Sequence, residues 1–394
     1  MKTFTNENVN LDILKDRAHN LRWAEVPDGV IPLTAADSDF PCAPEIVDTL
    51  KEYIKDGYFP YVENRGMPEF KNSLAKFFNE RKNEHVNPEY ILPIDSAARG
   101  MNIIAHSFIE PGDECIVFDP VDFLFRTNME DAGGVIKLFP SNLKEDRISL
   151  EGLEYYITPK TKMIGFCNPH NPMGMLYSKD DLKYLLDLSE KYGFYIMNDE
   201  IWSDIVYPGN HFNSLLEFGP EMNKRTLSVY GFSKTFGVAG LRIGCIYATN
   251  QENYEKLAQT SMADQTIGGI NLLSQIAGIA CLTKSLYRVD EYVEHITANR
   301  DYALDRLNKM PLIKCHKPQA TFVLFPDISE VGMNPVDFVN LLKEEYKIAI
   351  VPGGKRFFGP GSEGHVRICL ATSHEILKEG LDRIEKCLND IKNK

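Results

Sequence analysis

The sequence predicts an α/β fold, with a mostly parallel central sheet in a large domain and a smaller α+β domain after it. From about residue 46 to residue 270, stretches with a helical pattern alternate with short β-branched runs. This alternation implies parallel strands with helices on both faces of the sheet. The chain of 394 residues is also too long for one compact core, which suggests two lobes.

The elements follow in order along the chain. Residues 1–45 are predicted to form an irregular arm that joins the small domain, residues 46–285 the large domain, and residues 286–394 the small C-terminal domain. A long helical region, about 271–309, has apolar spacing on one side and should lead out of the large domain. The predicted strands are Glu114–Phe118, Val135–Phe139, Met163–Phe166, Phe194–Met197, Thr226–Tyr230, Ile243–Ala248, Ala320–Phe325, Ala349–Val351 and His365–Leu370.

Composition excludes several classes of function. The net charge of −13 disfavours binding to nucleic acid or to an anionic membrane. The polar N-terminus has no apolar signal region, and no run approaches the length of a membrane span. Eight scattered cysteines contain no Cys-x-x-Cys pair and no metal-ligand spacing. We therefore expect a cytoplasmic protein with reduced thiols and no metal site.

The most informative stretch lies at residues 231–244. Lys234 stands there among small residues, after a strand-like run that ends at Tyr230. Only a neutral amine attacks an aldehyde, so a lysine that forms a Schiff base has to be desolvated and held still. Ser233 before it and Arg242 after it would suit a phosphate monoester. An isolated Ser-Lys pair is more often a surface turn, so the interpretation depends on the rest of the chain.

Two upstream segments complete the pattern. Residues 167–174 follow a strand-like run and contain two X-Pro steps, which force an extended, turn-rich path. The apolar run from Phe194 ends in Asp199, which places a charge at the carboxyl edge of a sheet. The motifs Asn-Pro-x-Asn-Pro-x-Gly, Asp-Glu and Ser-Lys with a later Gly-x-Arg stand in the order found in fold-type-I pyridoxal-phosphate (PLP) enzymes, the aspartate aminotransferase superfamily. The chain resembles that family from about Asp37 to its end, and this implies the PLP-dependent transferase fold and pyridoxal 5′-phosphate as cofactor.

The resemblance implies a role for each motif residue. Lys234 matches the lysine that forms the Schiff base and moves the α-proton of the substrate. Asp199 matches the partner of the pyridine nitrogen, which a buried carboxylate keeps protonated. Asn171 is expected to donate to the 3-oxygen of the ring and to lie beside the substrate. Arg367 matches the arginine that clamps the α-carboxylate of the amino-acid substrate.

The phosphate of the cofactor is assigned to other residues. Ser233 and Arg242 would hold it with their side chains. The family usually has Ser-Gly or Asn-Gly in the turn that opens the next helix, whereas this chain has Ala97 and Ala98, whose small side chains still let backbone N–H groups approach the phosphate. Tyr61 matches a tyrosine that reaches the cofactor phosphate of the neighbouring subunit. The resemblance therefore implies a homodimer with shared active sites.

Two segments are more similar to the carbon–sulfur β-lyases of the MalY/PatB (cystathionine β-lyase) group than to ordinary aminotransferases. One is the Ala-Asp-Ser-Asp-Phe run that begins at Ala36, which makes Ala36 a candidate substrate-binding residue. The other runs from Asp199 to Gly209. These segments favour the lyases within the superfamily.

Two aromatic positions depart from the family pattern. Trp202 stands where the lyase group has histidine and aminotransferases have tyrosine. An indole donates one hydrogen bond and cannot accept a proton, so Trp202 is either a cofactor-binding residue or a packing residue. The aromatic ring that stacks on the pyridine normally follows a Pro-x pair, but here Asp122 follows it. Phe123 is therefore our candidate for stacking, ahead of Phe125.

These observations leave three interpretations. The favoured one is a carbon–sulfur β-lyase that cleaves L-cystathionine or cysteine S-conjugates to a thiol, pyruvate and ammonia. The alternative is an aminotransferase for a neutral or aromatic amino acid and a 2-keto acid, because both reactions begin by removing the same α-proton. The third is a non-catalytic PLP-binding regulatory protein, which the intact set of motif residues argues against.

Overall fold

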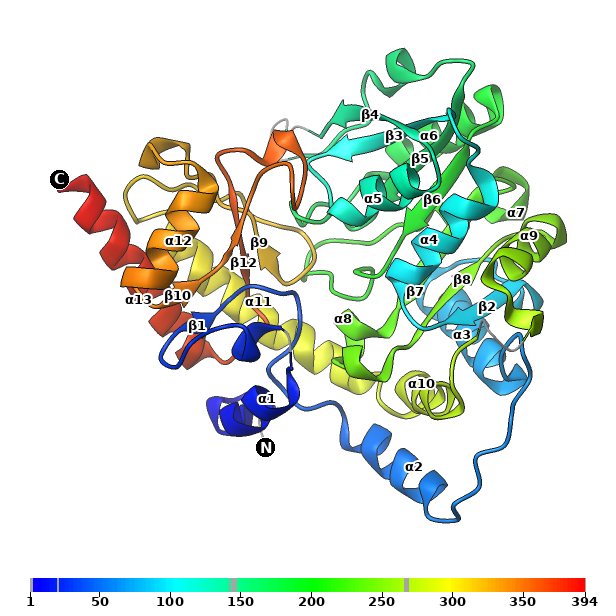
Figure 1. Ribbon diagram of the computed structural model, residues 1–394, viewed down its shortest axis with the longest axis horizontal. Helices are drawn as coiled ribbons and strands as arrows, with labels where there is room; N and C mark the ends of the chain where they lie inside the picture. Colours follow the sequence, from blue (N-terminus) through cyan, green and yellow to red (C-terminus); the bar gives the residue numbers. More distant parts are fainter. Residues whose placement is uncertain (1–2, 20, 142, 144–146, 266–268, 394) are drawn as a thin grey trace.

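The computed structural model describes residues 3–19, 21–141, 143, 147–265 and 269–393. The other residues of the predicted arm and large domain, 1–2, 20, 142, 144–146 and 266–268, lie outside this description, as does residue 394. Figure 1 shows a large sheet with its helices on one side of the molecule and a smaller group of strands and helices on the other.

The large sheet confirms the predicted α/β fold. Its strand order is β2-β8-β7-β6-β5-β3-β4, and β8 is antiparallel to both of its neighbours while the other pairs are parallel. The six strands predicted for this domain are present within two residues of their expected bounds. The sheet consists of β2 Ile91–Ile94, β3 Glu114–Asp119, β4 Val135–Pro140, β5 Thr161–Cys167, β6 Tyr195–Asp199, β7 Thr226–Gly231 and β8 Gly244–Tyr247.

Strand β2 was not expected from the sequence. It has only four residues, and Pro93 within it reduces the strand signal because proline cannot donate to a ladder. It can lie at the edge of the sheet, where it pairs with β8 alone.

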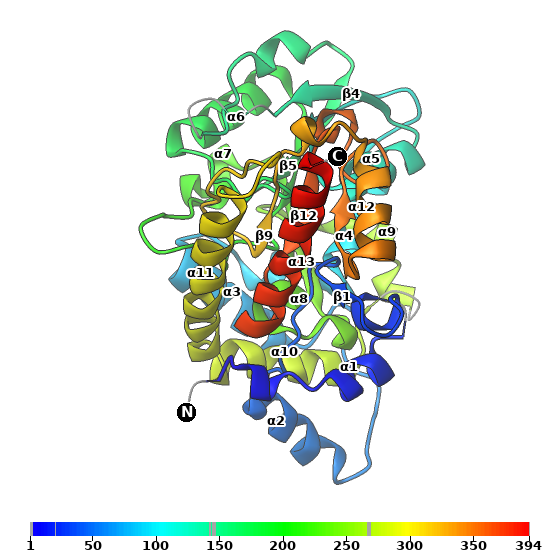
Figure 2. The same cartoon turned by 90° about the vertical axis from the view of Figure 1, so that its left-hand side faces the viewer.

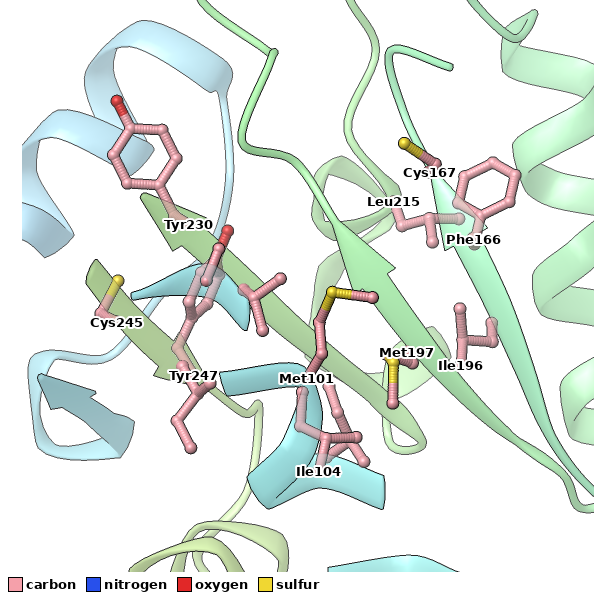
Figure 3. Packing of buried hydrophobic residues seen from close by; sticks show 14 of the residues in the cluster. Met101, Ile104, Phe166, Cys167, Ile196, Met197, Leu215, Tyr230, Cys245 and Tyr247 are labelled. Atoms are coloured by element: carbon pink, nitrogen blue, oxygen red, sulfur yellow. The ribbon is translucent and has the colours of Figure 1, made fainter. Parts of the chain in front are cut away.

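The core of the large domain lies where helix α4 (Ala97–Phe108) packs on the sheet. Figure 3 shows Met101 and Ile104 of this helix beside Ile196 and Met197 of β6. All four side chains are at most 1 % exposed. Because α4 contacts β6, β7 and β8, its first residues are held near the ends of these strands.

The helical region predicted at 271–309 is divided into two helices, α10 (Leu272–Lys284) and α11 (Tyr287–Leu307). The break falls at Ser285, whose hydroxyl donates to the carbonyls of Ala280 and Cys281 and so ends α10. Helix α10 packs on α2 and α3 of the large domain, whereas α11 packs on α13. The remaining helices of the large domain are α2 Pro44–Ile54, α3 Pro68–Lys82, α5 Phe123–Asp131, α6 Lys179–Tyr192, α7 Gly219–Met222, α8 Phe232–Phe236 and α9 Gln251–Ser261.

The small group of elements has its own buried cluster, which includes Ile296, Phe322 and Ile368. Figure 2 shows α13 (His374–Lys392) between α11 and α12 (Pro335–Glu345). Its strands are β9 Val323–Leu324, β10 Ile348–Ala349, β11 Val351–Pro352 and β12 Val366–Cys369.

The N-terminal arm pairs with these elements. Strand β1 (Ile31–Pro32) lies parallel to β10, and Leu33 accepts a hydrogen bond from the backbone N–H of Cys369. The arm also contains helix α1 (Leu11–Arg17). A domain boundary near residue 286 stays a prediction, and the two hydrophobic clusters meet in that region, since Val289 belongs to the first and Tyr292 to the second. Within the described ranges, no helix combines the length and the apolar character needed to cross a bilayer.

Candidate active site

A cavity of about 320 Å³ lies where the carboxyl ends of β6 and β7 meet the N-terminal arm and β12. This volume is at the lower end of the range of ~300–1,000 Å³ that is usual for small-molecule sites. Most of the sequence-predicted site residues line it together. They are Ala36, Ala97, Ala98, Asn171, Asp199, Trp202, Ser233, Lys234, Arg242 and Arg367.

Lys234 lies on the short helix α8, directly after β7. Its Nζ donates to the carbonyl oxygen of Ala36 at 2.5 Å and lies 5.5 Å from the ring centre of Trp202. Burial lowers the pKa of Lys234 below its ordinary value. The position therefore favours the neutral amine that nucleophilic attack requires.

Asp199 is the last residue of β6 and is 8 % exposed. Its Oδ1 accepts from the backbone N–H of Ile201 at 3.0 Å. Burial raises the pKa of this carboxyl group to about 7. A cationic partner in the cavity would restore its ionised form, so the group is suited to hold a protonated ring nitrogen.

Arg367 on β12 is 8 % exposed, and burial lowers its pKa. Its two terminal nitrogens make long hydrogen bonds of 3.4 Å to Asn171 Oδ1 and to the carbonyl oxygen of Thr34. Among the described residues, Nε has no hydrogen-bond partner, and the two terminal nitrogens donate to an amide and a carbonyl oxygen rather than to a carboxylate. A buried guanidinium without a counter-ion is suited to an anionic ligand, and its planar fork matches a carboxylate.

The far end of the cavity lies at the start of α4. Ala97 and Ala98 are the first two residues of this helix, and Ser96 caps it by accepting from the N–H of Arg99 at 3.2 Å. Gly244 allows the close approach of β8, because a Cβ atom there would lie 2.9 Å from the carbonyl oxygen of Tyr230 and 3.3 Å from the nitrogen of Ala97. The positive end of the α4 dipole therefore faces the cavity.

Arg242 and Ser233 also line the cavity, and Arg242 lies near Asp95, which precedes α4. The Arg242 side chain is 58 % exposed, and its Nη2 lies 3.7 Å from Asp95 Oδ1. A hydroxyl, a guanidinium and a helix N-terminus together form a donor set for a phosphate group.

The structure places Phe123 outside the cavity lining, and its stacking role stays a prediction. Its side chain is 40 % exposed and lies outside the cavity lining, whereas its neighbours Asp122 and Leu124 line it. Helix α5 begins at Phe123, and successive side chains of a helix point about 100° apart. The alternative, Phe125, is 0 % exposed and packs in the core beside Gly165.

Of two other predicted residues, Trp202 lines the cavity and Tyr61 does not. Trp202 is 3 % exposed, lines the cavity and packs edge-on against Phe322 with the ring centres 4.6 Å apart. Tyr61 is 96 % exposed and lies outside the lining, in the segment between α2 and α3. The chain alone therefore does not bring Tyr61 to the cavity.

Sequence reasoning missed several lining residues. The acidic ones are Asp37, Asp95 and Asp122, and the apolar ones include Met101, Leu124 and Ile201. Asp122 had a signal, because it occupies the position after the Pro-x pair where the resemblance places an aromatic residue. The apolar residues had none, since any buried helix or strand offers the same residue types.

Comparisons with known proteins agree with this geometry. The chain is 32% identical over 366 residues to the aspartate aminotransferase of Thermotoga maritima, with 92% of each chain covered. It is similar to the crystal structure of an aromatic aminotransferase from Pyrococcus horikoshii OT3, with a TM-score of 0.86, 28% identity, and 96% of this chain and 99% of that chain covered. A PLP-bound structure from Clostridium difficile 630 matches with a TM-score of 0.86 and 25% identity over 96% of this chain and 95% of that chain.

The family model for aminotransferase class I and II matches residues 28–384, which include every lining residue discussed above. The chain therefore belongs to the class I and II aminotransferase family, and its cofactor is pyridoxal 5′-phosphate.

Proposed function

We propose that the protein is an aminotransferase that acts on a neutral or aromatic amino acid and a 2-keto acid. The aminotransferase names of the relatives support this alternative over the lyase that we favoured from the sequence. The observation that carries the proposal is the buried guanidinium of Arg367, which has no carboxylate partner among the described residues, donates to Asn171 at 3.4 Å and lines the same cavity as Lys234. It offers an α-carboxylate a place beside the reactive amine.

The residues present fit the cofactor. Ser233, Arg242 and the first amides of α4 would hold its phosphate, and Asp199 would hold its ring nitrogen. Lys234 would attach it covalently, and Asn171 would donate to its ring oxygen. When bound, the cofactor supplies an aldehyde for the amino group and a ring that accepts the electron pair left at the α-carbon.

The protein's own residues then orient the substrate and move one proton. Arg367 binds the α-carboxylate and so fixes the direction of the α-carbon. The Nζ atom of Lys234, whose pKa is lowered by burial, takes the proton from that carbon and returns it. The carboxylate of Asp199 would supply the negative charge that keeps the ring nitrogen protonated. In amino-group transfer the proton is returned to a carbon other than the α-carbon of the substrate. In elimination a group leaves the β-carbon instead.

A product assay tests the proposal. The holoenzyme is incubated with L-phenylalanine, L-leucine or L-cystathionine, each with and without pyruvate or 2-oxoglutarate. We expect a new keto acid whose repeated formation, beyond one molecule per site, requires an acceptor keto acid. Free thiol and ammonia from L-cystathionine without an acceptor would overturn the proposal and restore the lyase.

The role of Arg367 makes a separable prediction. Arg367→Lys should raise the KM for the amino acid by about 10- to 100-fold, because a point charge cannot reproduce the bidentate fork. The absorbance of bound cofactor should stay almost unchanged. Arg383→Lys, on α13 and outside the cavity lining, is the matched control and should leave KM unchanged. Loss of cofactor from Arg367→Lys would show that Arg367 serves the phosphate or the fold instead.

We also propose that two copies of the chain form a homodimer. In Figure 1 the segment between α2 and α3 stands away from the rest of the molecule. It exposes Tyr58, Phe59 and Tyr61 to 79 %, 57 % and 96 %. Such apolar exposure is unusual for a surface that stays in water, and a symmetric second copy would bury it. The resemblance then carries Tyr61 to the cofactor phosphate of the other subunit.

Tyr61→Phe tests this arrangement. It should weaken cofactor affinity by about 1–3 kcal/mol, the loss of one hydrogen bond to a charged acceptor, and sedimentation should still show a dimer. A heterodimer of one Tyr61→Phe chain and one Lys234→Ala chain, formed by subunit exchange, has two sites. One site contains both changes. The other site combines the intact Lys234 of the first chain with the intact Tyr61 of the second and should bind cofactor with normal affinity. An active monomer, or heterodimers without such a site after verified exchange, would refute the shared site.

A further inference from the structure

Asp122 occupies a fixed place in the cavity. Its Oδ1 accepts from the N–H of Leu124 at 3.1 Å, and its Oδ2 accepts from Asn171 Nδ2 at 3.0 Å. Its own N–H donates to the Asn171 carbonyl at 3.2 Å. The carboxylate is thus held from both sides, while each oxygen keeps capacity for a further donor.

The amide of Asn171 joins Asp122 to Arg367. Its nitrogen donates to Asp122, and its oxygen accepts from the Arg367 guanidinium at 3.4 Å. Only one amide group therefore separates the carboxylate from the guanidinium. Asp122 is also the first of the charges that offset the effect of burial on the pKa of Arg367. A substrate carboxylate bound on Arg367 would therefore lie about one amide group away from the Asp122 carboxylate.

The charges around the cavity are unevenly divided. The described lining contains three cations, Lys234, Arg242 and Arg367, and the proposed function gives each of them a task. It contains four carboxylates, Asp37, Asp95, Asp122 and Asp199. Asp199 is assigned to the ring nitrogen, and Asp95 lies 3.7 Å from Arg242. Asp37 and Asp122 are therefore the two carboxylates of the described lining without an assigned role. The described lining contains no further cation that could bind a second carboxylate of the substrate.

We propose that Asp122 is the specificity-determining residue of this site: its fixed carboxylate excludes amino acids with an acidic side chain and admits those whose side chain is uncharged or donates hydrogen bonds. The inference rests on the proposed function, because it requires the α-carboxylate to lie on Arg367. This substrate specificity would distinguish the chain from enzymes that accept aspartate as a substrate.

The test compares isosteric substrates of different charge. With holoenzyme and saturating pyruvate, kcat/KM is measured for aspartate against asparagine and for glutamate against glutamine. We expect the wild-type protein to prefer the amide of each pair. Asp122→Asn should raise the acid-to-amide ratio about 10- to 100-fold, since it removes the repulsion between two carboxylates a few ångströms apart.

Three variants keep the test interpretable. Asparagine caps a helix as well as aspartate does, so Asp122→Asn should preserve the start of α5. Asp122→Ser also caps the helix, and it should shift the ratio in the same direction even if the asparagine variant folds poorly. Asp187→Asn, on the exposed surface of α6, is the matched control and should leave the ratio unchanged.

The outcomes distinguish a failure of the inference about Asp122 from a failure of the proposed function. A wild-type protein that prefers the dicarboxylic substrates, as it would if the partner subunit supplied a cation, overturns the inference about Asp122. So does an unchanged ratio in both Asp122 variants. The proposed function survives these results as long as keto-acid formation beyond one molecule per site requires an acceptor. Absence of acceptor-dependent transfer from every amino acid overturns the proposed function and the inference together.

Discussion

Lys234→Ala should lose both turnover and the covalently bound cofactor. The wild-type protein should be yellow as isolated, and borohydride should fix pyridoxyl label on the chain. In the variant, no amine replaces Nζ, which lies 2.5 Å from the Ala36 carbonyl, so neither attachment nor proton transfer from the α-carbon is possible. We expect a rate loss of at least about 10⁴-fold. Cofactor should still bind weakly through the phosphate donors.

The measurement is the combination of absorbance, label and initial rate. Lys224→Ala, which removes an exposed lysine paired with Glu221, is the matched control and should keep all three. Full activity in Lys234→Ala, or label on a different lysine, would contradict the account of the cavity.

Asp199→Ala should have the second largest effect. Loss of the carboxylate leaves the ring nitrogen without a partner in a buried place, and the ring then accepts electrons poorly. We expect a fall in kcat on the order of 10³-fold or more. The change should appear mainly in kcat, because Asp199 is not expected to touch the substrate.

A cofactor analogue with a carbon atom in place of the ring nitrogen isolates this role. The wild-type protein reconstituted with the analogue should lose rate as the variant does. Asp199→Ala reconstituted with the analogue should lose little more, since both changes remove the same interaction. Additive losses would mean that Asp199 acts elsewhere, and an unchanged rate with the natural cofactor would mean that its carboxylate does not face the ring.

Much of the fold could be predicted from local pattern. The β-branched runs at Glu114–Phe118 and Thr226–Tyr230 became β3 and β7, because buried parallel strands consist of continuous apolar residues. Lys234 and Asp199 could be located because they end or follow such strands. The division of residues 271–309 at Ser285 was not predictable, because both helices have apolar faces, and only the tertiary structure shows that α10 packs on α2 and α3 while α11 packs on α13.

Elements of the site that depend on tertiary geometry were missed. Whether Phe123 or its neighbours face the cavity is decided by where α5 begins, and a difference of one residue turns the side chain by about 100°. The proximity of Ala36 to Lys234 requires the arm to lie across both domains. The likeness to the lyases rested on short runs around Ala36 and Asp199. These runs contribute residues to the cavity lining, but they do not determine which carbon atom receives the proton.

The stoichiometry of a reaction without acceptor distinguishes amino-group transfer from elimination. Holoenzyme is mixed with an excess of a neutral or aromatic amino acid and no keto acid, and the keto acid and ammonia released are counted against the number of sites. The account predicts one keto acid per site, no free ammonia, and further turnover only after an acceptor keto acid is added. Continuous release of ammonia with many keto acids per site would contradict it.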